Sequence, residues 1–439
     1  MMLRITLPDN NIPEREYIIR FLFADLLGLP FSVNTDANAS HYSISFESNE
    51  IIIRDGFFSL NPEPLSYLKK EALPGKIVFV RNEFTTEDDI PVIFGTDEML
   101  VTEHRIICGI DIFASAFFML SRWEEYVNRS RDDHDRFPGS ESIALKHGFL
   151  HRPVVNEYAE MLWNMLCRLG YSGERRHRSY EPAFTHDVDI LDYPSAGRAI
   201  AADILKRKDI KGAVKHLKHY LKTGQSPYDF FDFLMDSSEE LGAQSHFYFM
   251  ASSSNMPRDP KSYLDSKRFR AKIREIKGRG HIIGFHPGYY TYNDPERWTA
   301  EKENLEKAAD TSITEGRQHY LRFDIEKTLR IWEMNNMEID STPSYAQDEG
   351  FRCGTGDVFH VFDFLQRRQL KLKERPLVVM DGTLHQYKKY SHEKALSVVR
   401  HYISAGRKYN SPVTLLFHNS SFYGEWEGYS SVYSRILCL

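Results

Sequence analysis

Short apolar runs and amphipathic stretches alternate along the second half of this 439-residue chain. Each run holds five to seven residues, and a loop or a stretch with helical spacing of its apolar positions follows it. The runs predict strands at 183–187, 245–251, 281–286, 315–321, 337–341, 376–381 and 413–418. The amphipathic stretches predict helices at 229–241, 265–277, 325–336, 358–369 and 393–407. Such alternation favours βαβ units built around a parallel sheet.

The first half of the chain has a different pattern, which indicates a separate unit. Its apolar positions predict two strands, at 51–53 and 76–80, and two helices, at 110–128 and 152–169. A polar segment at 173–178 then separates the two patterns. Because the chain is longer than a typical single core, we expect two domains: a smaller α/β domain at 1–178 and a second α/β domain at 179–439.

Composition excludes several classes of protein. The chain is 41% hydrophobic and 27% charged with a net charge of −6, so nothing in its overall charge favours nucleic acid as a partner. Its four cysteines are scattered, which fits a reducing compartment. The N-terminus lacks the pattern of a signal peptide, and the longest apolar run, 112–120, is too short to cross a bilayer. We therefore expect a cytoplasmic protein without a transmembrane segment.

One segment, 198–223, is strongly basic. It holds eight lysines and arginines against Asp203 and Asp209, and its apolar residues recur at roughly helical spacing. A solvated pair of surface helices explains this pattern. A weak contact with a membrane surface or an anionic glycan is the alternative.

Reactive side chains gather at the ends of the predicted strands. Asp187 and Asp189 lie at the end of the first strand. Because they are two residues apart, both carboxylates point to the same side of the strand, where they need a metal or a counter-charge. Others follow in the same position, namely His286, His319, Asp340, Asp381 and His418. The C-terminal ends of parallel strands converge on one edge, where the active sites of such folds lie. We therefore expect these residues to form one site.

Four motifs give this half a family resemblance. They are Thr185-His186-Asp187-Val188-Asp189, Gly284-Phe285-His286-Pro287-Gly288-Tyr289-Tyr290, Arg317-Gln318-His319-Tyr320 and Leu415-Leu416-Phe417-His418. In order and placement they resemble the motifs of the polysaccharide deacetylase family, which carries the NodB homology domain, over residues 180–439. The resemblance implies a distorted (β/α)7 barrel that uses a divalent metal, usually zinc, to hydrolyse N- or O-acetyl groups on sugars.

The resemblance also implies a metal site. Asp187 corresponds to the catalytic base, and Asp189 takes the role of a metal ligand together with His286. The family's second metal histidine is replaced by Tyr290. A tyrosine is a poor zinc ligand near neutral pH, since its ordinary pKa is about 10. By its position at the same edge, His319 is the preferred third ligand, with His246 and Tyr290 as the alternatives.

The remaining motifs imply catalytic roles. The backbone amide of Tyr320 would help to hold a developing oxyanion, and Arg317 belongs to the same motif. Arg352 resembles the basic residue that orients the catalytic aspartate. His418 corresponds to the acid that protonates the leaving amine or alcohol. Asp381 either orients this histidine or caps a helix.

A second resemblance concerns the first half. Residues 109–126 resemble an uncharacterised accessory domain that precedes some bacterial deacetylase-like domains, and this implies no activity. Its charged loop at 131–136 could reach the mouth of the site. The leading hypothesis is a metal-dependent deacetylase acting on a sugar or glycan precursor. The alternatives are a hydrolase of another non-peptide C–N bond and a degenerate, non-catalytic glycan-binding protein.

Overall fold

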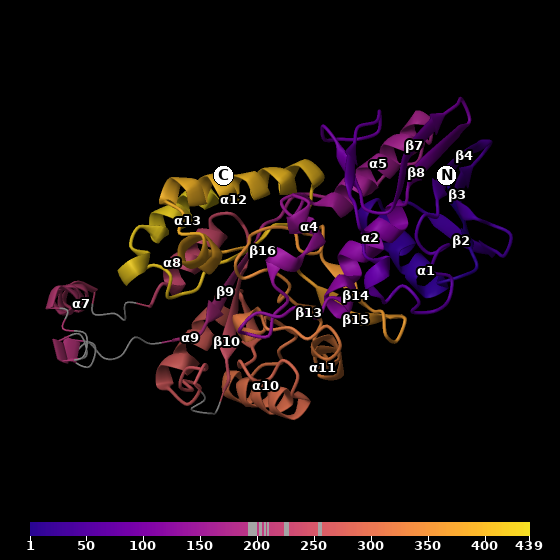
Figure 1. Cartoon of the computed structure of the whole chain (residues 1–439). Coiled ribbons are helices and arrows are strands. Elements are labelled where there is room, and N and C mark those ends of the chain that lie inside the picture. The colour runs from indigo at the N-terminus through magenta and orange to yellow at the C-terminus, as the bar shows by residue number, and fades with distance from the viewer. Residues whose placement is uncertain (192–199, 202–203, 206–207, 209, 224–227, 253–256) are drawn as a thin grey trace.

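Two mixed β-sheets, one from each half of the chain, form the framework of the protein (Figure 1). The computed structural model describes residues 1–191, 200–201, 204–205, 208, 210–223, 228–252 and 257–439. Helices lie on the faces and ends of both sheets, so the structure is a mixed α/β fold.

The N-terminal sheet has six strands in the order β2-β1-β3-β4-β8-β7. β1 runs parallel to β2 and β4 runs parallel to β8, whereas the other neighbours are antiparallel. The strands are β1 (Leu3–Pro8), β2 (Phe31–Asp36), β3 (His41–Phe46), β4 (Asn49–Arg54), β7 (Gly95–Val101) and β8 (Arg105–Ile110). A separate antiparallel pair consists of β5 (Val78–Val80) and β6 (Ile90–Val92).

Helix α2 (Ile112–Ser121) is the centre of this half, because all of its residues are buried. The Asp111 carboxylate caps it by accepting a hydrogen bond from the Ala114 amide. Arg122, in a left-handed conformation with φ 52°, ends α2, so the helix predicted at 110–128 is split in two. The other helices here are α1 (Ile12–Arg20), α3 (Glu124–Val127), α4 (Ile143–Lys146) and α5 (Val154–Arg168).

The second sheet has nine strands in the order β14-β15-β13-β12-β11-β10-β9-β17-β16. Each of the seven predicted runs contains one of its strands, and these seven are parallel to their neighbours. They are β9 (Ala183–Val188), β10 (Ser245–Met250), β11 (Ile282–His286), β12 (Glu315–Gly316), β13 (Ile339–Asp340), β16 (Leu377–Met380) and β17 (Thr414–Leu416). Strands buried on both faces read as continuous apolar runs, which is the pattern of the sequence.

The helix predicted at 358–369 is wrong. This segment begins a hairpin of β14 (Phe359–Asp363) and β15 (Arg368–Glu374), with Arg367 in a left-handed conformation at the turn. β15 pairs in parallel with β13, and β14 packs on α2 of the N-terminal half. The sheet is therefore a curved, nine-stranded half-barrel with β14 and β16 at its edges, and the (β/α)7 detail is not confirmed.

The helices of the second half surround this sheet, except α7, which projects away from it in Figure 1. They are α7 (Ile210–Thr223), α8 (Phe231–Glu239), α9 (Lys267–Gly278), α10 (Pro295–Ala309), α11 (Thr328–Met334), α12 (His392–Tyr409) and α13 (Tyr429–Leu437). Four of them match predicted helices, whereas α10 and α13 were not predicted. The basic segment 198–223 lies partly outside the described residues. Among the described helices, none is long and apolar enough to cross a membrane.

Buried ion pairs join the two halves. The Arg122 guanidinium contacts the Glu374 carboxylate at 2.8 Å, and Arg352 contacts Glu125 at 2.6 Å. One continuous apolar core includes residues of both sheets. The halves thus share a core, and the domain boundary after residue 178 stays a prediction.

Candidate active site

The predicted site residues meet at the C-terminal ends of the parallel strands of the nine-stranded sheet. Asp187 lies in β9 and His286 is the last residue of β11. They line a cavity of about 440 Å³ together with Asp189, His319 and His418. The convergence follows from the parallel register, in which Asp187 lies opposite Tyr248 and His286 opposite Met250 of β10. The sheet therefore gathers residues that are more than 200 positions apart in the sequence.

Asp189, His286 and His319 form a cluster that could hold a metal ion. One ligand atom from each residue lies within 4.8 Å of the others. The Asp189 Oδ1 atom is 3.2 Å from His286 Nε2 and 3.6 Å from His319 Nε2. This oxygen is also buried and accepts no hydrogen bond from the described residues. One carboxylate and two imidazoles are a ligand set that suits zinc and related divalent ions.

Both histidines are held by their other ring nitrogen. His286 Nδ1 lies 2.6 Å from the Arg317 carbonyl oxygen, and His319 Nδ1 lies 3.0 Å from Asp259 Oδ1. Donation from Nδ1 leaves Nε2 free of a proton and directs it to the cluster, as in metal-binding histidines. Sequence reasoning missed Asp259, because it lies in a loop after β10 and belongs to no motif. Only the fold brings it to His319.

Asp187 is held by Arg317 behind the cluster. Arg317 Nη1 donates to Asp187 Oδ1 at 2.8 Å, and its other donors bind Thr185 Oγ1 and Ser341. The preceding residue must be glycine, since a Cβ on Gly316 would lie 2.0 Å from the Phe285 carbonyl oxygen. This close approach of two backbone segments helps to place the buried Arg317 guanidinium beside Asp187. The other carboxylate oxygen, Asp187 Oδ2, faces the cluster and lies 3.8 Å from His286 Nε2.

His418 also faces the cluster. Its Nδ1 lies 2.9 Å from Asp381 Oδ1, and its backbone amide donates to Asp381 Oδ2 at 2.7 Å. Its Nε2 lies 4.0 Å from Asp189 Oδ2. Asp381 therefore contacts the imidazole, as the first of the two roles left open by the sequence requires, and its Oδ1 also accepts the Gly382 amide at 2.6 Å at the start of the following helix.

The charges of the cluster shift its pKa values. Burial would raise the pKa of Asp189, but the facing imidazoles of His319 and His286 hold it well below its usual range. Burial would lower the pKa of His418, but the Asp381 carboxylate outweighs this and raises it to about 10. The pKa of His286 is raised in the same way by Asp187 and Asp189 against the effect of burial. Carboxylates packed this closely require positive charge, which imidazolium or a divalent cation can supply.

The N-terminal half contributes to the cavity through its charged loop. His134 and Arg136 line the cavity, and His134 Nδ1 lies 3.1 Å from the Tyr289 hydroxyl. Arg136 Nη1 donates to the Tyr320 carbonyl at 3.0 Å. Tyr320 has a left-handed backbone with φ 60° and ψ 12°, and its ring lines the same cavity. The two halves therefore build this site jointly.

Arg352 lies elsewhere and does not contact Asp187, the expected catalytic base. Its guanidinium binds both oxygens of Glu125 and the Ser344 carbonyl, at the contact between the two halves. The residue that contacts Asp187 is Arg317. Asp340 is likewise outside the cavity, where it accepts hydrogen bonds from Thr342.

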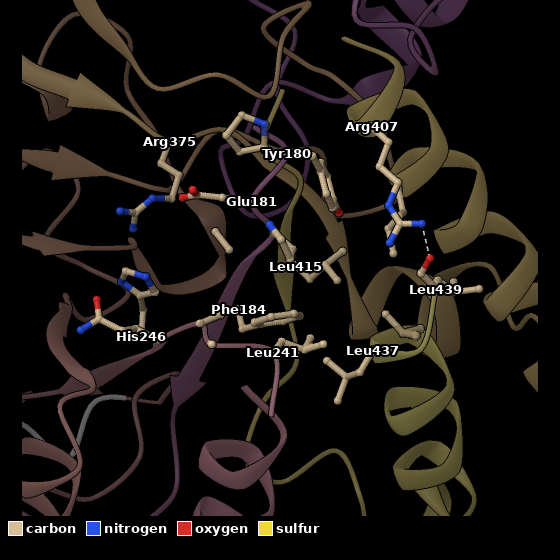
Figure 2. Close-up of a pocket in the computed structure, with 18 of the residues that line it drawn as sticks. Tyr180, Glu181, Phe184, Leu241, His246, Arg375, Arg407, Leu415, Leu437 and Leu439 are labelled. Atoms are coloured by element: carbon tan, nitrogen blue, oxygen red, sulfur yellow. Dashed lines mark hydrogen bonds between the residues drawn. The ribbon is translucent and has the colours of Figure 1, made fainter. Parts of the chain in front are cut away.

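His246 lies near the N-terminal end of β10, at the opposite ends of the strands from the cluster, and cannot be the third ligand. It is 2.5 Å from Glu315 and lines a larger cavity of about 690 Å³ at the N-terminal ends of the strands. Figure 2 shows this cavity, with His246 and Arg375 on one side, Phe184 and Leu415 near the middle, and Arg407 and Leu439 on the far side. Tyr290, the other alternative, is not among the residues that line the cavity of the Asp189 cluster.

Residues 3–171 match the profile of a family of unknown function, DUF7033. This agrees with the expectation of an uncharacterised domain in the first half. None of the curated proteins matches the chain.

Two solved structures are similar to part of this chain. One, from Mycobacterium smegmatis, is assigned as a polysaccharide deacetylase; it is 16% identical with a TM-score of 0.39, and the match covers 60% of this chain and 84% of that one. The other is the polysaccharide deacetylase Bc1974 from Bacillus cereus, 10% identical with a TM-score of 0.29, covering 60% and 86%. These values are too low to bear on the activity of this chain.

Proposed function

We propose that this protein is a metal-dependent hydrolase that removes N- or O-linked acetyl groups from a sugar or glycan precursor. The observation that carries the proposal is that two hydrogen-bonded pairs of side chains lie beside one candidate metal centre. Arg317 anchors Asp187, and Asp381 anchors His418. A base and an acid that both face a metal centre are what hydrolysis of an amide or ester needs.

The cluster of Asp189, His286 and His319 fits a divalent ion. Its buried carboxylate oxygen accepts no hydrogen bond from the part of the chain that the structure describes, and both imidazoles turn a nitrogen toward it. Three protein ligands leave coordination positions open, as in catalytic rather than structural zinc sites. When bound there, a divalent ion would supply Lewis-acid activation of water and of the acyl carbonyl.

The protein's own residues would then move the protons. Asp187 would take a proton from the attacking water through the oxygen that Arg317 leaves free. The Tyr320 amide would donate to the oxyanion that forms as the water oxygen adds to the acyl carbon. His418 would give its Nε2 proton to the departing nitrogen or oxygen as the C–N or C–O bond breaks. The products are acetate and the free amine or hydroxyl.

Aromatic side chains around the cavity support a carbohydrate as the substrate. Tyr320, Tyr387 and Trp426 line it, together with the polar Gln386. Aromatic faces pack on the apolar faces of sugar rings, while polar groups orient hydroxyls.

Acetate release from a panel of N- and O-acetylated sugars and oligosaccharides tests the proposal. The wild-type protein should release acetate, and D187N should lose on the order of a hundredfold or more of this activity while keeping its metal. The exposed Asp265, in the connection between β10 and α9, offers a matched control, because D265N makes the same charge change outside the cavity. Opening of cyclic amides without acetate release would contradict the proposal, as would sugar binding without turnover.

A further inference from the structure

Helix α7 carries an exposed apolar stripe. Ile210, Val214, Leu217 and Leu221 are 71%, 46%, 44% and 74% exposed. Spacings of four, three and four residues place all four on one face of the helix. Large apolar side chains rarely gather on an exposed face without a partner surface. The stripe therefore indicates that α7 contacts an apolar environment in its working state.

Lysines run along one flank of this stripe. Lys211 and Lys218 are exposed, and Lys215 and Lys222 continue the same spacing in the sequence, each one residue after an apolar position. Residues 210–223 contain no aspartate or glutamate, so the helix is uniformly cationic. Exposed Leu205 and Lys208 precede it with the same combination of apolar and basic character. The partner of α7 must accordingly be both anionic and apolar.

The position of α7 also suits contact with an extended surface. The helix projects away from the nine-stranded sheet (Figure 1). Ile190 precedes the segment that contains α7, and Tyr228 follows it. Asn419 Nδ2, beside the candidate active site, donates to the carbonyls of both residues at 3.0 and 3.1 Å. Asn419 directly follows His418. Ile190 and Tyr228, which flank the segment that contains α7, therefore lie beside the candidate active site.

We propose that α7 binds the surface of a membrane that contains anionic phospholipids, with its apolar stripe inserted below the headgroups and its lysines among them. Helices with a narrow apolar face and a lysine-rich flank bind in the plane of such an interface. A polyanionic glycan would match the lysines but leave the leucines in water, so it explains only half of the pattern. The inference goes beyond the proposed hydrolase activity and does not depend on it.

Sedimentation of the full-length chain with lipid vesicles tests this inference. We expect binding to phosphatidylcholine vesicles that contain phosphatidylglycerol, weaker binding to phosphatidylcholine alone, and a decrease with added salt. The variant L217D/L221D should lose on the order of a hundredfold in vesicle affinity, since two leucines no longer enter the apolar layer. The variant K211Q/K218Q should lose about tenfold or more on the anionic vesicles only.

A matched control separates this effect from a general change in the surface. Leu60 is 77% exposed in the other half of the chain, so L60D makes the same chemical change elsewhere and should bind vesicles like the wild type. The α7 variants should keep the wild-type Tm, because the altered residues are exposed. Failure of the wild type to bind anionic vesicles would overturn the inference, and so would equal vesicle binding by L217D/L221D and the wild type. Binding of a protein partner by α7 in place of vesicles would also overturn it.

Discussion

Replacing Asp259 by asparagine measures how much its carboxylate contributes to metal affinity. Asp259 is not itself a proposed metal ligand, but it contacts one. Asp259 Oδ1 lies 3.0 Å from His319 Nδ1 and also accepts the Tyr289 amide at 2.8 Å. The carboxylate holds the proton on Nδ1, so Nε2 stays available at 3.6 Å from Asp189. An asparagine keeps the size of the side chain and an acceptor for the Tyr289 amide, but it removes the charge that favours this tautomer.

The expected loss follows from the strength of such contacts. Carboxylates that orient metal-binding histidines contribute about 10- to 100-fold to metal affinity. D259N should therefore bind zinc or cobalt on the order of 1.4 to 2.7 kcal/mol more weakly than the wild type. Titration against a competing chelator measures this affinity directly. The exposed D265N, six residues further along the same connection, should bind the metal like the wild type.

Two outcomes would refute this reasoning. If D259N held the metal as tightly as the wild type, His319 would not be a ligand whose orientation Asp259 controls. If D265N lost as much affinity as D259N, the effect would reflect the overall charge of the surface and not the contact with His319.

Three further predictions follow from other contacts. R317K should lower kcat by tenfold or more with little change in KM, because lysine cannot hold Asp187 with the same fork of donors. R136A should lower kcat several-fold at saturating substrate, since the Tyr320 carbonyl loses its donor. Burial raises the pKa of Glu124 from 4.5 to about 8, so its contribution to stability is full below pH 4.5 and is lost as the pH rises towards 8. Urea unfolding should therefore show E124Q gaining about 4 kcal/mol relative to the wild type between pH 4 and pH 8, and a pH-independent difference would contradict this.

The parallel strands and their reactive ends could be predicted because both depend on local patterns. Buried parallel strands read as apolar runs, and the side chains at their ends interrupt these runs with charge. Asp187, His286 and His418 each follow this rule and reach one cavity. The motifs therefore located the site, although they could not supply its geometry.

The features that were missed depend on contacts between distant segments. The 358–369 segment has apolar positions that suit a helix as well as a strand, and its pairing with β15 and packing against α2 decide for a strand. Arg352 lies in a loop between Gly350 and Gly354, and only the fold brings it to Glu125. Asp259 has no local signal at all, since its importance comes from its contact with His319. Such pairings are properties of the folded chain that no single sequence window contains.

The metal content of the purified protein tests the central claim most directly. After incubation with zinc and removal of free metal, elemental analysis should find one divalent ion per chain in the wild type. It should find a large loss of bound metal in H286A, in D189A and in H319A. H246A should keep full metal occupancy, because His246 lies at the opposite ends of the strands from the cluster. Absence of a stoichiometric ion from the wild type, or retention of the ion in all three ligand variants, would contradict a metal centre formed by Asp189, His286 and His319.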